Sequence, residues 1–409
     1  MYLQTNYFIS EGIIMISEKM KKAVGGNSVI RAMFEEGKRL SDIYGAENVF
    51  DFSIGNPNVE PPATIKKAIL EILDEESPNK IHGYMNNSGY EDVREAIAQD
   101  INKKHGLDLT FKNIVMTVGA AGGLSIIFKT ILNPEDEVIT FSPYFSEYRN
   151  YVSDNGGKLV IVPTHMGTFE LDLVALEAAI TPRTKAIIIN NPNNPTGVIY
   201  KEDIIKGLAE LLTKKSEELN TCIFIISDEP YRELVYDDIK IPYMLNYYKN
   251  AFIGYSYSKS LSLPGERIGY VAFSNEMDDV DDVVQGLNIA TRSIGYVNAP
   301  SLFQRVIAKC LDSEVDVSIY KKNRDLLYNH LISIGFECTK PEGAFYLFVK
   351  ALIPDDTAFA AAAKKYNLLI VPGSAFGCPG YFRLAYCTSY AKIEKSLDAW
   401  TKLAKEFIK

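Results

Sequence analysis

Hydrophobic residues follow two spacings along the chain, and the change of spacing divides it into stretches. From Ile16 to Tyr44 they recur every three or four residues, as in a helix, and Val49 to Ile54 then alternates as a short strand. From there to about Asn298, short β-rich runs alternate with helical stretches, which predicts a parallel-dominated α/β sheet. The strands expected here are Ile114 to Val118, Glu137 to Phe141, Lys158 to Val162, Ala186 to Asn190, Cys222 to Ser227, Ala251 to Tyr255 and Tyr270 to Phe273.

The pattern changes after Pro300. Long helical runs come first, then two strands and a last helix: Ser301 to Cys310, Val317 to Ile334, Ala344 to Val349, Tyr381 to Tyr386 and a helix from about Ala391. We therefore expect an α/β fold with a large domain over residues 50–298, whose mostly parallel mixed sheet is sandwiched by helices. Residues 15–49 and 299–409 should form a smaller α+β domain, and residues 1–14 an N-terminal extension.

Composition and charge limit the classes of partner. The chain has 409 residues, 47% of them hydrophobic and 23% charged, which is ample for a large core. A net charge of -9 argues against general affinity for nucleic acid or anionic lipid, which needs a positive surface. No apolar run approaches the roughly 20 residues of a membrane helix. We expect a soluble protein that binds a small molecule.

The cysteines and the N-terminus bear on location. Five widely spread cysteines are odd in number and show no metal-ligand spacing, so we expect reduced thiols in the cytoplasm and no metal site. Residues 1–14 lack the basic region, compact apolar segment and cleavage site of a signal peptide. An upstream start and an arm that packs on a partner both stay open for this segment.

Polar clusters follow several expected strands, where open α/β sheets gather their ligands. Residues 117–123, TVGAAGG, leave a strand and enter an apolar helix, so that free amide groups can bind a phosphate, although a tight turn explains the glycines equally well. Residues 190–197, NNPNNPTG, form a proline-fixed loop that presents amide side chains. Residues 227–231, SDEPY, place a carboxylate at the end of a very apolar strand, where it needs a partner.

A lysine among hydroxyl groups marks the last cluster. Residues 255–260, YSYSKS, end a strand and are followed by GERIGY at residues 265–270. A buried lysine readily loses its proton and then serves as an amine nucleophile toward a carbonyl. Taken singly, each of these residues is more often structural than catalytic.

Together these segments resemble the class I/II aminotransferases of fold type I, which use pyridoxal 5'-phosphate. The NPNNPTG loop, the DEPY strand end and the SxSK segment, with Arg267 eight positions beyond Lys259, form a specific set, and the resemblance extends from about Asp51 to Arg383. It implies that Lys259 holds the cofactor aldehyde as an internal aldimine and then carries a proton as general base. By the same resemblance Asp228 pairs with the pyridine nitrogen, and Asn194 and Tyr231 hydrogen-bond the cofactor oxygen.

The resemblance also implies a phosphate site and a shared dimer. Phosphate is expected to be held by the amides of Ala120 and Ala121, the Ser256 hydroxyl and Arg267, and Phe145 to stack on the ring. Tyr84 resembles the tyrosine that reaches the phosphate of the neighbouring subunit's cofactor, which implies a homodimer.

Substrate residues are implied in the same way. Arg383 matches the arginine that clamps the substrate α-carboxylate, and Gly55 and Asn194 are expected beside it. Arg292 lies near the position where aspartate aminotransferases place a partner-subunit arginine for a side-chain carboxylate, although the spacing to Asn298 and Pro300 does not match cleanly. Aspartate with 2-oxoglutarate is therefore a candidate substrate pair.

Two alternatives remain at this stage. A C–S β-lyase or an amino-acid decarboxylase uses the same lysine, aspartate and phosphate site, because a fold does not determine the reaction. A non-catalytic cofactor-binding regulator is a third possibility, but it would carry a DNA-binding module, and the sequence has neither a basic patch nor such an extension. The sequence favours the aminotransferase.

Overall fold

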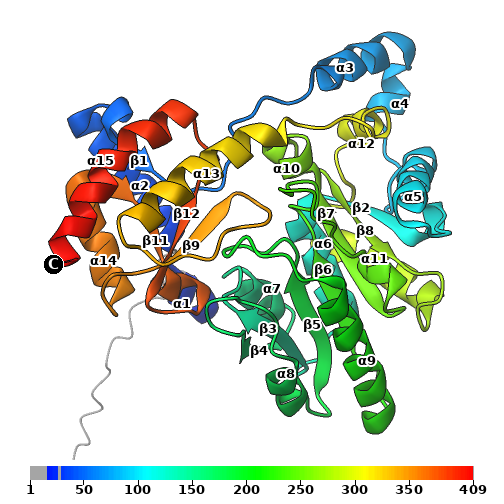
Figure 1. The fold of residues 1–409 in the computed structure, drawn as a ribbon. Helices are drawn as coiled ribbons and strands as arrows, with labels where there is room; N and C mark the ends of the chain where they lie inside the picture. Colours follow the sequence, from blue (N-terminus) through cyan, green and yellow to red (C-terminus); the bar gives the residue numbers. More distant parts are fainter. Residues whose placement is uncertain (1–15, 26–28, 409) are drawn as a thin grey trace, which may run out of the picture.

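A computed structural model describes residues 16–25 and 29–408 (Figure 1). The expected extension over residues 1–14 lies outside the described residues. The helix expected from Ile16 to Tyr44 is described as two helices, α1 and α2, on either side of residues 26–28. The helices are α1 (Glu18–Gly25), α2 (Val29–Tyr44), α3 (Ala63–Glu75), α4 (Pro78–His82), α5 (Glu91–His105), α6 (Gly119–Ile131), α7 (Tyr148–Asp154), α8 (Leu173–Ala179), α9 (Glu202–Leu219), α10 (Tyr257–Ser260), α11 (Val280–Ser293), α12 (Ser301–Ala308), α13 (Val317–Ser333), α14 (Asp356–Ala363) and α15 (Tyr390–Phe407).

A seven-stranded mixed sheet forms the centre of the larger part of the molecule. Its strands are β2 (Ile114–Thr117), β3 (Glu137–Ser142), β4 (Lys158–Pro163), β5 (Thr184–Asn190), β6 (Phe224–Asp228), β7 (Ala251–Ser256) and β8 (Gly269–Phe273). They lie in the order β2-β8-β7-β6-β5-β3-β4, and β8 runs in the opposite direction to the other six. The predicted parallel-dominated sheet is therefore confirmed.

Helices cover both faces of this sheet because successive strand residues point to opposite sides. Ile187 packs with α5 and α9 in one hydrophobic cluster, whereas its neighbours Ala186 and Ile188 pack with α6 and α11 in another. The same division holds along β6, where Ile225 joins the first cluster and Ile226 the second. The predicted sandwich of helices around the sheet is confirmed.

A third hydrophobic cluster belongs to a smaller antiparallel sheet, on the left of Figure 1. Strands β9 (Tyr346–Lys350), β12 (Tyr381–Ala385) and β11 (Val371–Pro372) form it, and α13, α14 and α15 pack against it. Strand β1 (Phe50–Asp51) pairs in parallel with β10 (Leu368–Leu369). Helix α12, which the sequence pattern grouped with this part, instead packs on α3 and α5 beside the large sheet.

The strand expected from Val49 to Ile54 is shorter than the alternation suggests. It ends at Asp51, because the Asp51 carboxylate accepts hydrogen bonds from the backbone N–H and the hydroxyl of Ser53, at 2.8 and 2.6 Å, and turns the chain. The turn directs residues 53–55 toward the carboxyl ends of the large sheet's strands, where the candidate site lies.

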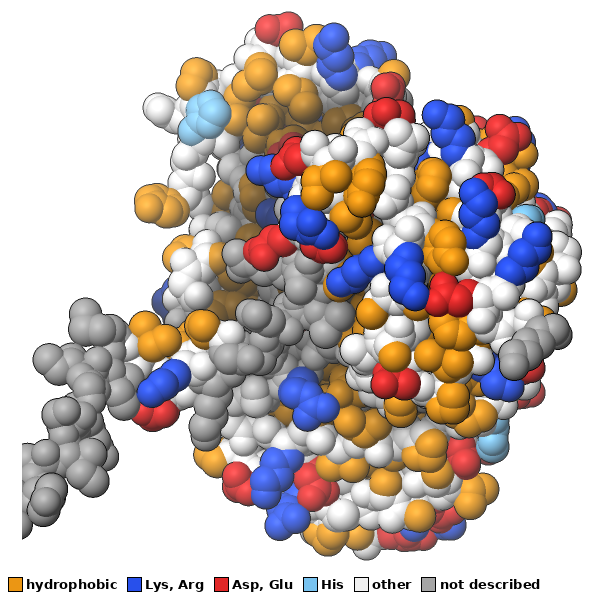
Figure 2. All heavy atoms as spheres, turned by 90° about the vertical axis from the view of Figure 1, so that its left-hand side faces the viewer, with side chains coloured by type: hydrophobic (Ala, Val, Ile, Leu, Met, Phe, Trp, Pro, Cys, Tyr) orange, Lys and Arg blue, Asp and Glu red, His pale blue; other side chains and the backbone are white. Residues whose placement is uncertain are grey.

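Charges of both signs are mixed on the surface that carries α1, α2 and α15. Figure 2 shows lysine and arginine side chains interspersed with aspartate and glutamate there, without a large area of one sign.

Among the described residues, no helix is long and apolar enough to cross a membrane.

Candidate active site

A cavity of about 370 Å³ lies at the carboxyl ends of β5, β6 and β7, between the two sheets. Its walls include Gly55, Ala120, Ala121, Phe145, Asn194, Asp228, Tyr231, Ser256, Lys259, Arg267 and Arg383. The structure thus brings together every residue that the sequence nominated for the site, with the exception of Tyr84 and Arg292.

Lys259 extends from the short helix α10 into this cavity. Its Nζ donates a 2.7 Å hydrogen bond to the carbonyl oxygen of Gly55 and lies 5.4 Å from the centre of the Phe345 ring. Burial lowers the pKa of the Lys259 amine to about 8, and the positive charges of Arg267 and Arg383 act in the same direction. About a tenth of the amine is therefore neutral and nucleophilic at pH 7, far more than at the usual lysine pKa.

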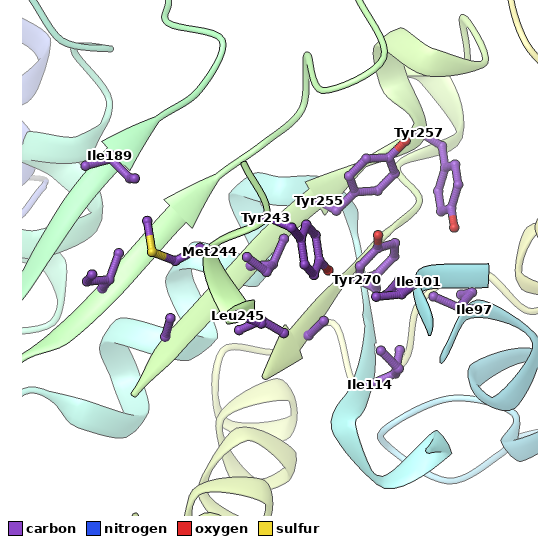
Figure 3. Packing of buried hydrophobic residues seen from close by; sticks show 14 of the residues in the cluster. Ile97, Ile101, Ile114, Ile189, Tyr243, Met244, Leu245, Tyr255, Tyr257 and Tyr270 are labelled. Atoms are coloured by element: carbon purple, nitrogen blue, oxygen red, sulfur yellow. The ribbon is translucent and has the colours of Figure 1, made fainter. Parts of the chain in front are cut away.

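Tyrosines anchor the segment that carries this lysine (Figure 3). The rings of Tyr255 and Tyr270 stack with centroids 4.8 Å apart, and Tyr257 meets Tyr255 edge-on at 5.0 Å. The Tyr255 hydroxyl donates a 2.9 Å hydrogen bond to Ser260 Oγ, one residue after the lysine. Because both ends of α10 are held by packed rings and a hydrogen bond, the lysine backbone is fixed relative to the sheet.

Asp228 ends β6 and is buried beneath the cavity. Its Oδ2 accepts a 2.6 Å hydrogen bond from the Tyr148 hydroxyl, and among the described residues nothing hydrogen-bonds Oδ1. Burial raises the pKa of the Asp228 carboxyl to about 7, although the Tyr148 hydrogen bond opposes this. A protonated nitrogen heterocycle in the cavity would satisfy Oδ1 and restore the charged carboxylate.

The first turn of α6 lines the opposite side. Gly119 has a φ of 74°, and a Cβ added there would lie 3.0 Å from Arg267 Nη2 and 3.5 Å from Ser256 Oγ. The free amides of the helix start, a serine hydroxyl and a guanidinium therefore converge on one small space. This is the donor set that an anionic phosphate requires.

Arg383 projects from β12 across the gap between the sheets. Its Nη1 donates to Asn194 Oδ1 at 3.0 Å and its Nη2 to the Ser53 carbonyl oxygen at 2.6 Å. Its guanidinium carbon lies 4.6 Å from the Tyr346 ring centre, and within the described chain its Nε lacks a partner. A fixed, buried guanidinium with spare donor capacity is suited to a carboxylate.

Tyr84 and Arg292 lie outside the cavity of their own chain. The side chain of Tyr84 is 97% exposed, and Arg292 is exposed in the last turn of α11. Neither contributes to the site within one chain, so both roles stay predictions about a second subunit.

The sequence pattern missed Tyr148, Asn190, Ser53 and Tyr346. Asn190 donates to the Asp228 carbonyl oxygen at 2.8 Å and accepts from the Asn194 backbone at 2.6 Å, while the Tyr346 and Tyr231 hydroxyls lie 2.9 Å apart. Asn190 and Tyr346 also line the cavity, whereas Tyr148 and Ser53 act through Asp228 and Arg383. Only the expectation that Asp228 needs a partner pointed toward one of them, Tyr148.

The cavity residues fit pyridoxal 5'-phosphate. The unpaired Asp228 Oδ1 suits the ring nitrogen, the α6 amides with Ser256 and Arg267 suit the phosphate, and Lys259 suits the aldehyde. The spare Arg383 Nε then remains for the carboxylate of an amino acid.

Comparison with known proteins gives the same family by a separate route. Residues 47–399 match the family model for aminotransferase class I and II. The chain is 33% identical over 377 residues to a probable aspartate/prephenate aminotransferase from Aquifex aeolicus, covering 88% of this chain and 92% of that protein.

Solved structures agree. A crystal structure of an amino transferase from Eubacterium rectale superposes with a TM-score of 0.95 at 46% identity, covering 97% of this chain and all of that one. The aspartate aminotransferase from Thermus thermophilus with maleate gives 0.82 at 26% identity, covering 92% and 97%. Sequence, cavity and relatives converge: the chain belongs to the class I and II aminotransferases and is a pyridoxal-phosphate-dependent aminotransferase.

Proposed function

We propose that this aminotransferase uses Lys259 as the covalent anchor for the cofactor and as the proton carrier of the reaction. The observation that carries the proposal is that the Lys259 amine and the Asp228 carboxylate face one cavity with pKa values near 8 and 7. The bound cofactor supplies an aldehyde that condenses with amines and a ring that accepts electrons from the substrate α-carbon.

The other residues of the cavity would hold and orient the cofactor and the substrate. Lys259 Nζ would take the substrate α-proton and hold it for return, while Asp228 would keep the ring nitrogen protonated and Tyr148 holds the Asp228 carboxylate in place. Asn194 and Tyr231 would donate to the cofactor oxygen. Phe145 would pack on the ring, and Ala120, Ala121, Ser256 and Arg267, which share the cavity, would hold the phosphate. Arg383 would bind the substrate α-carboxylate, with support from Asn194 and from Gly55 in the loop after β1.

Replacing the lysine tests this assignment. Lys259→Ala should lose the visible absorption band of the bound cofactor and turnover together, since no other amine is assigned to the aldehyde. Lys249→Ala is the control, because Lys249 is half-exposed and pairs with Asp278 on the surface. Undiminished transamination by Lys259→Ala would overturn the proposal.

For the substrate we propose aspartate as amino donor with 2-oxoglutarate as acceptor. The names of the Aquifex aeolicus and Thermus thermophilus proteins support this choice, and Arg292 from a second subunit would bind the side-chain carboxylate. A donor panel with 2-oxoglutarate and with pyruvate tests it. Release of pyruvate with ammonia and thiol from cysteine conjugates would instead indicate a C–S β-lyase.

We further propose a cytoplasmic homodimer in which Tyr84 of one subunit reaches the phosphate site of the other. Tyr84 is almost fully exposed, and Leu70 and Leu73 on the neighbouring helix α3 are about half exposed. These exposed apolar side chains support the proposal that a second subunit covers this surface.

Within each subunit we propose a large cofactor domain over residues 50–298, with α12 counted to it, and a smaller domain from the remaining described segments. The hydrophobic cluster that holds most buried residues of the small sheet supports this division, although Phe348 and Val371 of that sheet pack with the large-sheet cluster.

A further inference from the structure

Tyr346 occupies the point where three residues of the proposed site meet. It opens β9, opposite Ala385 of β12, and is 2% exposed. Its hydroxyl lies 2.9 Å from that of Tyr231, which belongs to the loop after β6 of the other sheet. Its ring lies 4.6 Å from the Arg383 guanidinium carbon. Tyr346 therefore bridges the two sheets at the cavity wall.

The third contact of Tyr346, with Gly55, explains why residue 55 is a glycine. A Cβ added at Gly55 would lie 2.1 Å from the Tyr346 hydroxyl oxygen, so no larger residue fits while that hydroxyl stays in place. The carbonyl oxygen of Gly55 accepts the hydrogen bond from Lys259 Nζ. The phenol is thus enclosed on one side by Gly55 and on the other by Tyr231.

The number of hydroxyl hydrogens determines which of the two tyrosines donates the hydrogen bond between them. Burial raises the pKa of Tyr346 to about 12 and that of Tyr231 well above its usual value, so both phenols keep their protons near neutral pH. Two protonated hydroxyls share one oxygen-to-oxygen contact, and one hydrogen remains free for a third group. Under the proposed function this third group is the cofactor oxygen, and Tyr231 is its donor. Tyr346 must then donate to Tyr231.

We propose that Tyr346 is a positioning residue that donates its hydroxyl hydrogen to Tyr231 Oη, directs the Tyr231 hydrogen toward the cofactor oxygen, and supports Arg383 with its ring. This inference rests on the proposed function and extends it to a residue that only indirectly reaches the reacting atoms. A phenol that accepts a hydrogen bond becomes a better donor, so the effect on the cofactor oxygen passes through Tyr231.

Tyr346→Phe separates the hydroxyl from the ring. A hydrogen bond to the deprotonated cofactor oxygen stabilises that form, so a weaker bond raises the pH at which the bound cofactor changes its visible spectrum. We expect Tyr346→Phe to raise this apparent pKa by about half a unit and to lower kcat about threefold or more. KM for the amino acid should change less than about twofold, because the ring beneath Arg383 is kept.

The double variant is the decisive measurement. Tyr231→Phe should raise the same pKa by more, and Tyr346→Phe in that background should add nothing, since the hydroxyl it serves is gone. Tyr346→Leu should in addition raise KM, because the guanidinium loses its ring face. Tyr236→Phe is the control: this buried tyrosine donates to the Ala344 carbonyl oxygen away from the cavity, and its loss should leave the spectrum unchanged.

Each outcome decides the matter. Additive shifts in the double variant, or an unchanged spectrum in Tyr346→Phe, would overturn the role of Tyr346 alone. If the unaltered enzyme forms no visible band with pyridoxal 5'-phosphate, the proposed function falls and this role with it. Should Tyr346→Phe not fold, Gly55→Ala gives the same test, because its methyl group must displace the Tyr346 hydroxyl and raise the same pKa.

Discussion

At the scale of single residues, Asp228 gives the cofactor-free protein an unusual dependence of stability on pH. Its pKa is raised from 3.8 to about 7, so between these values the folded protein holds a proton that the unfolded chain has lost. Stability contributed by the neutral carboxyl is therefore present at low pH and is lost as pH rises toward 7, by on the order of 4 kcal/mol.

Denaturant unfolding between about pH 4.5 and 7.5 measures this loss. We expect the cofactor-free protein to lose stability relative to Asp228→Asn across this range, and cofactor to remove this difference. The comparison isolates Asp228, because other groups, such as His105 with a pKa lowered to about 4 by burial, contribute equally to both proteins. Asp237→Asn is the matched control, because Arg324 holds the Asp237 pKa at about 2 and its charge stays constant in this range. An equal slope in Asp228→Asn would contradict a buried, neutral carboxyl.

Arg383 is predicted to set substrate affinity more than rate. Arg383→Lys keeps the charge but loses the fork that now contacts Asn194 and Ser53, so a substrate carboxylate loses at least one hydrogen bond. We expect KM for amino and oxo acids to rise about tenfold or more, with a smaller change in kcat. Steady-state kinetics with Arg183→Lys, an exposed surface arginine, as control measures the effect. An unchanged KM would place Arg383 outside the substrate site.

Cavity residues that lie in recognisable motifs were predictable from sequence, whereas cavity and supporting residues whose roles depend on long-range contacts, such as Tyr346 and Tyr148, were not. Lys259 and Asp228 stand in short motifs at strand ends, where residue type and position both indicate chemistry. Tyr148 and Tyr346 sit among ordinary aromatic residues of a helix and a strand, and their roles depend on contacts over 80 and 115 positions. Such contacts are fixed by tertiary packing, which no local pattern contains.

At the scale of elements, the start of α6 is predicted to control cofactor affinity. Gly119→Ala places a methyl group 3.0 Å from Arg267 Nη2 and forces alanine into a positive φ. We expect cofactor affinity to fall about tenfold, because the guanidinium must move away from the phosphate site. Gly106→Ala is the matched control, since Gly106 also has a positive φ, at the end of α5, but has nothing within 4 Å.

Cofactor dissociation constants and thermal unfolding separate the two effects. Both glycine variants should lose similar stability, about 1 kcal/mol, from backbone strain. Only Gly119→Ala should bind cofactor more weakly. Equal cofactor affinities in the two variants would show that the α6 amides and Arg267 do not act together.

The element pattern itself was largely predictable, but the sheet order was not. Short apolar, β-rich runs located the seven strands within a few residues, because all of them except the edge strand β4 are largely buried on both faces. The connection to β8 over residues 257–268 forms only the four-residue helix α10 and a short turn, without a full crossover helix, and β8 returns antiparallel to β7. This same connection holds both Lys259 and Arg267, so the reversal places the lysine and the arginine proposed to bind phosphate at one edge of the cavity.

At the scale of the whole molecule, a shared site predicts complementation between two inactive variants. Lys259→Ala lacks the amine, and Tyr84→Ala lacks the side chain that the partner's phosphate site is proposed to receive. In a mixed dimer, one site combines Lys259 from the second variant with Tyr84 from the first and is complete, while the other site lacks both. We expect the mixed dimer to show about half the activity of the unaltered dimer per mole.

Two different tags allow the mixed dimer to be purified from co-expressed variants, with each pure variant as its own control. If Tyr84 acted within its own chain, one site of the mixed dimer would lack the lysine and the other the tyrosine, and activity would stay at the level of the pure variants. Full activity of pure Tyr84→Ala would contradict any need for Tyr84. The exposure of its side chain, 97% in a single chain, favours the first outcome, because the ring lies outside the cavity of its own chain.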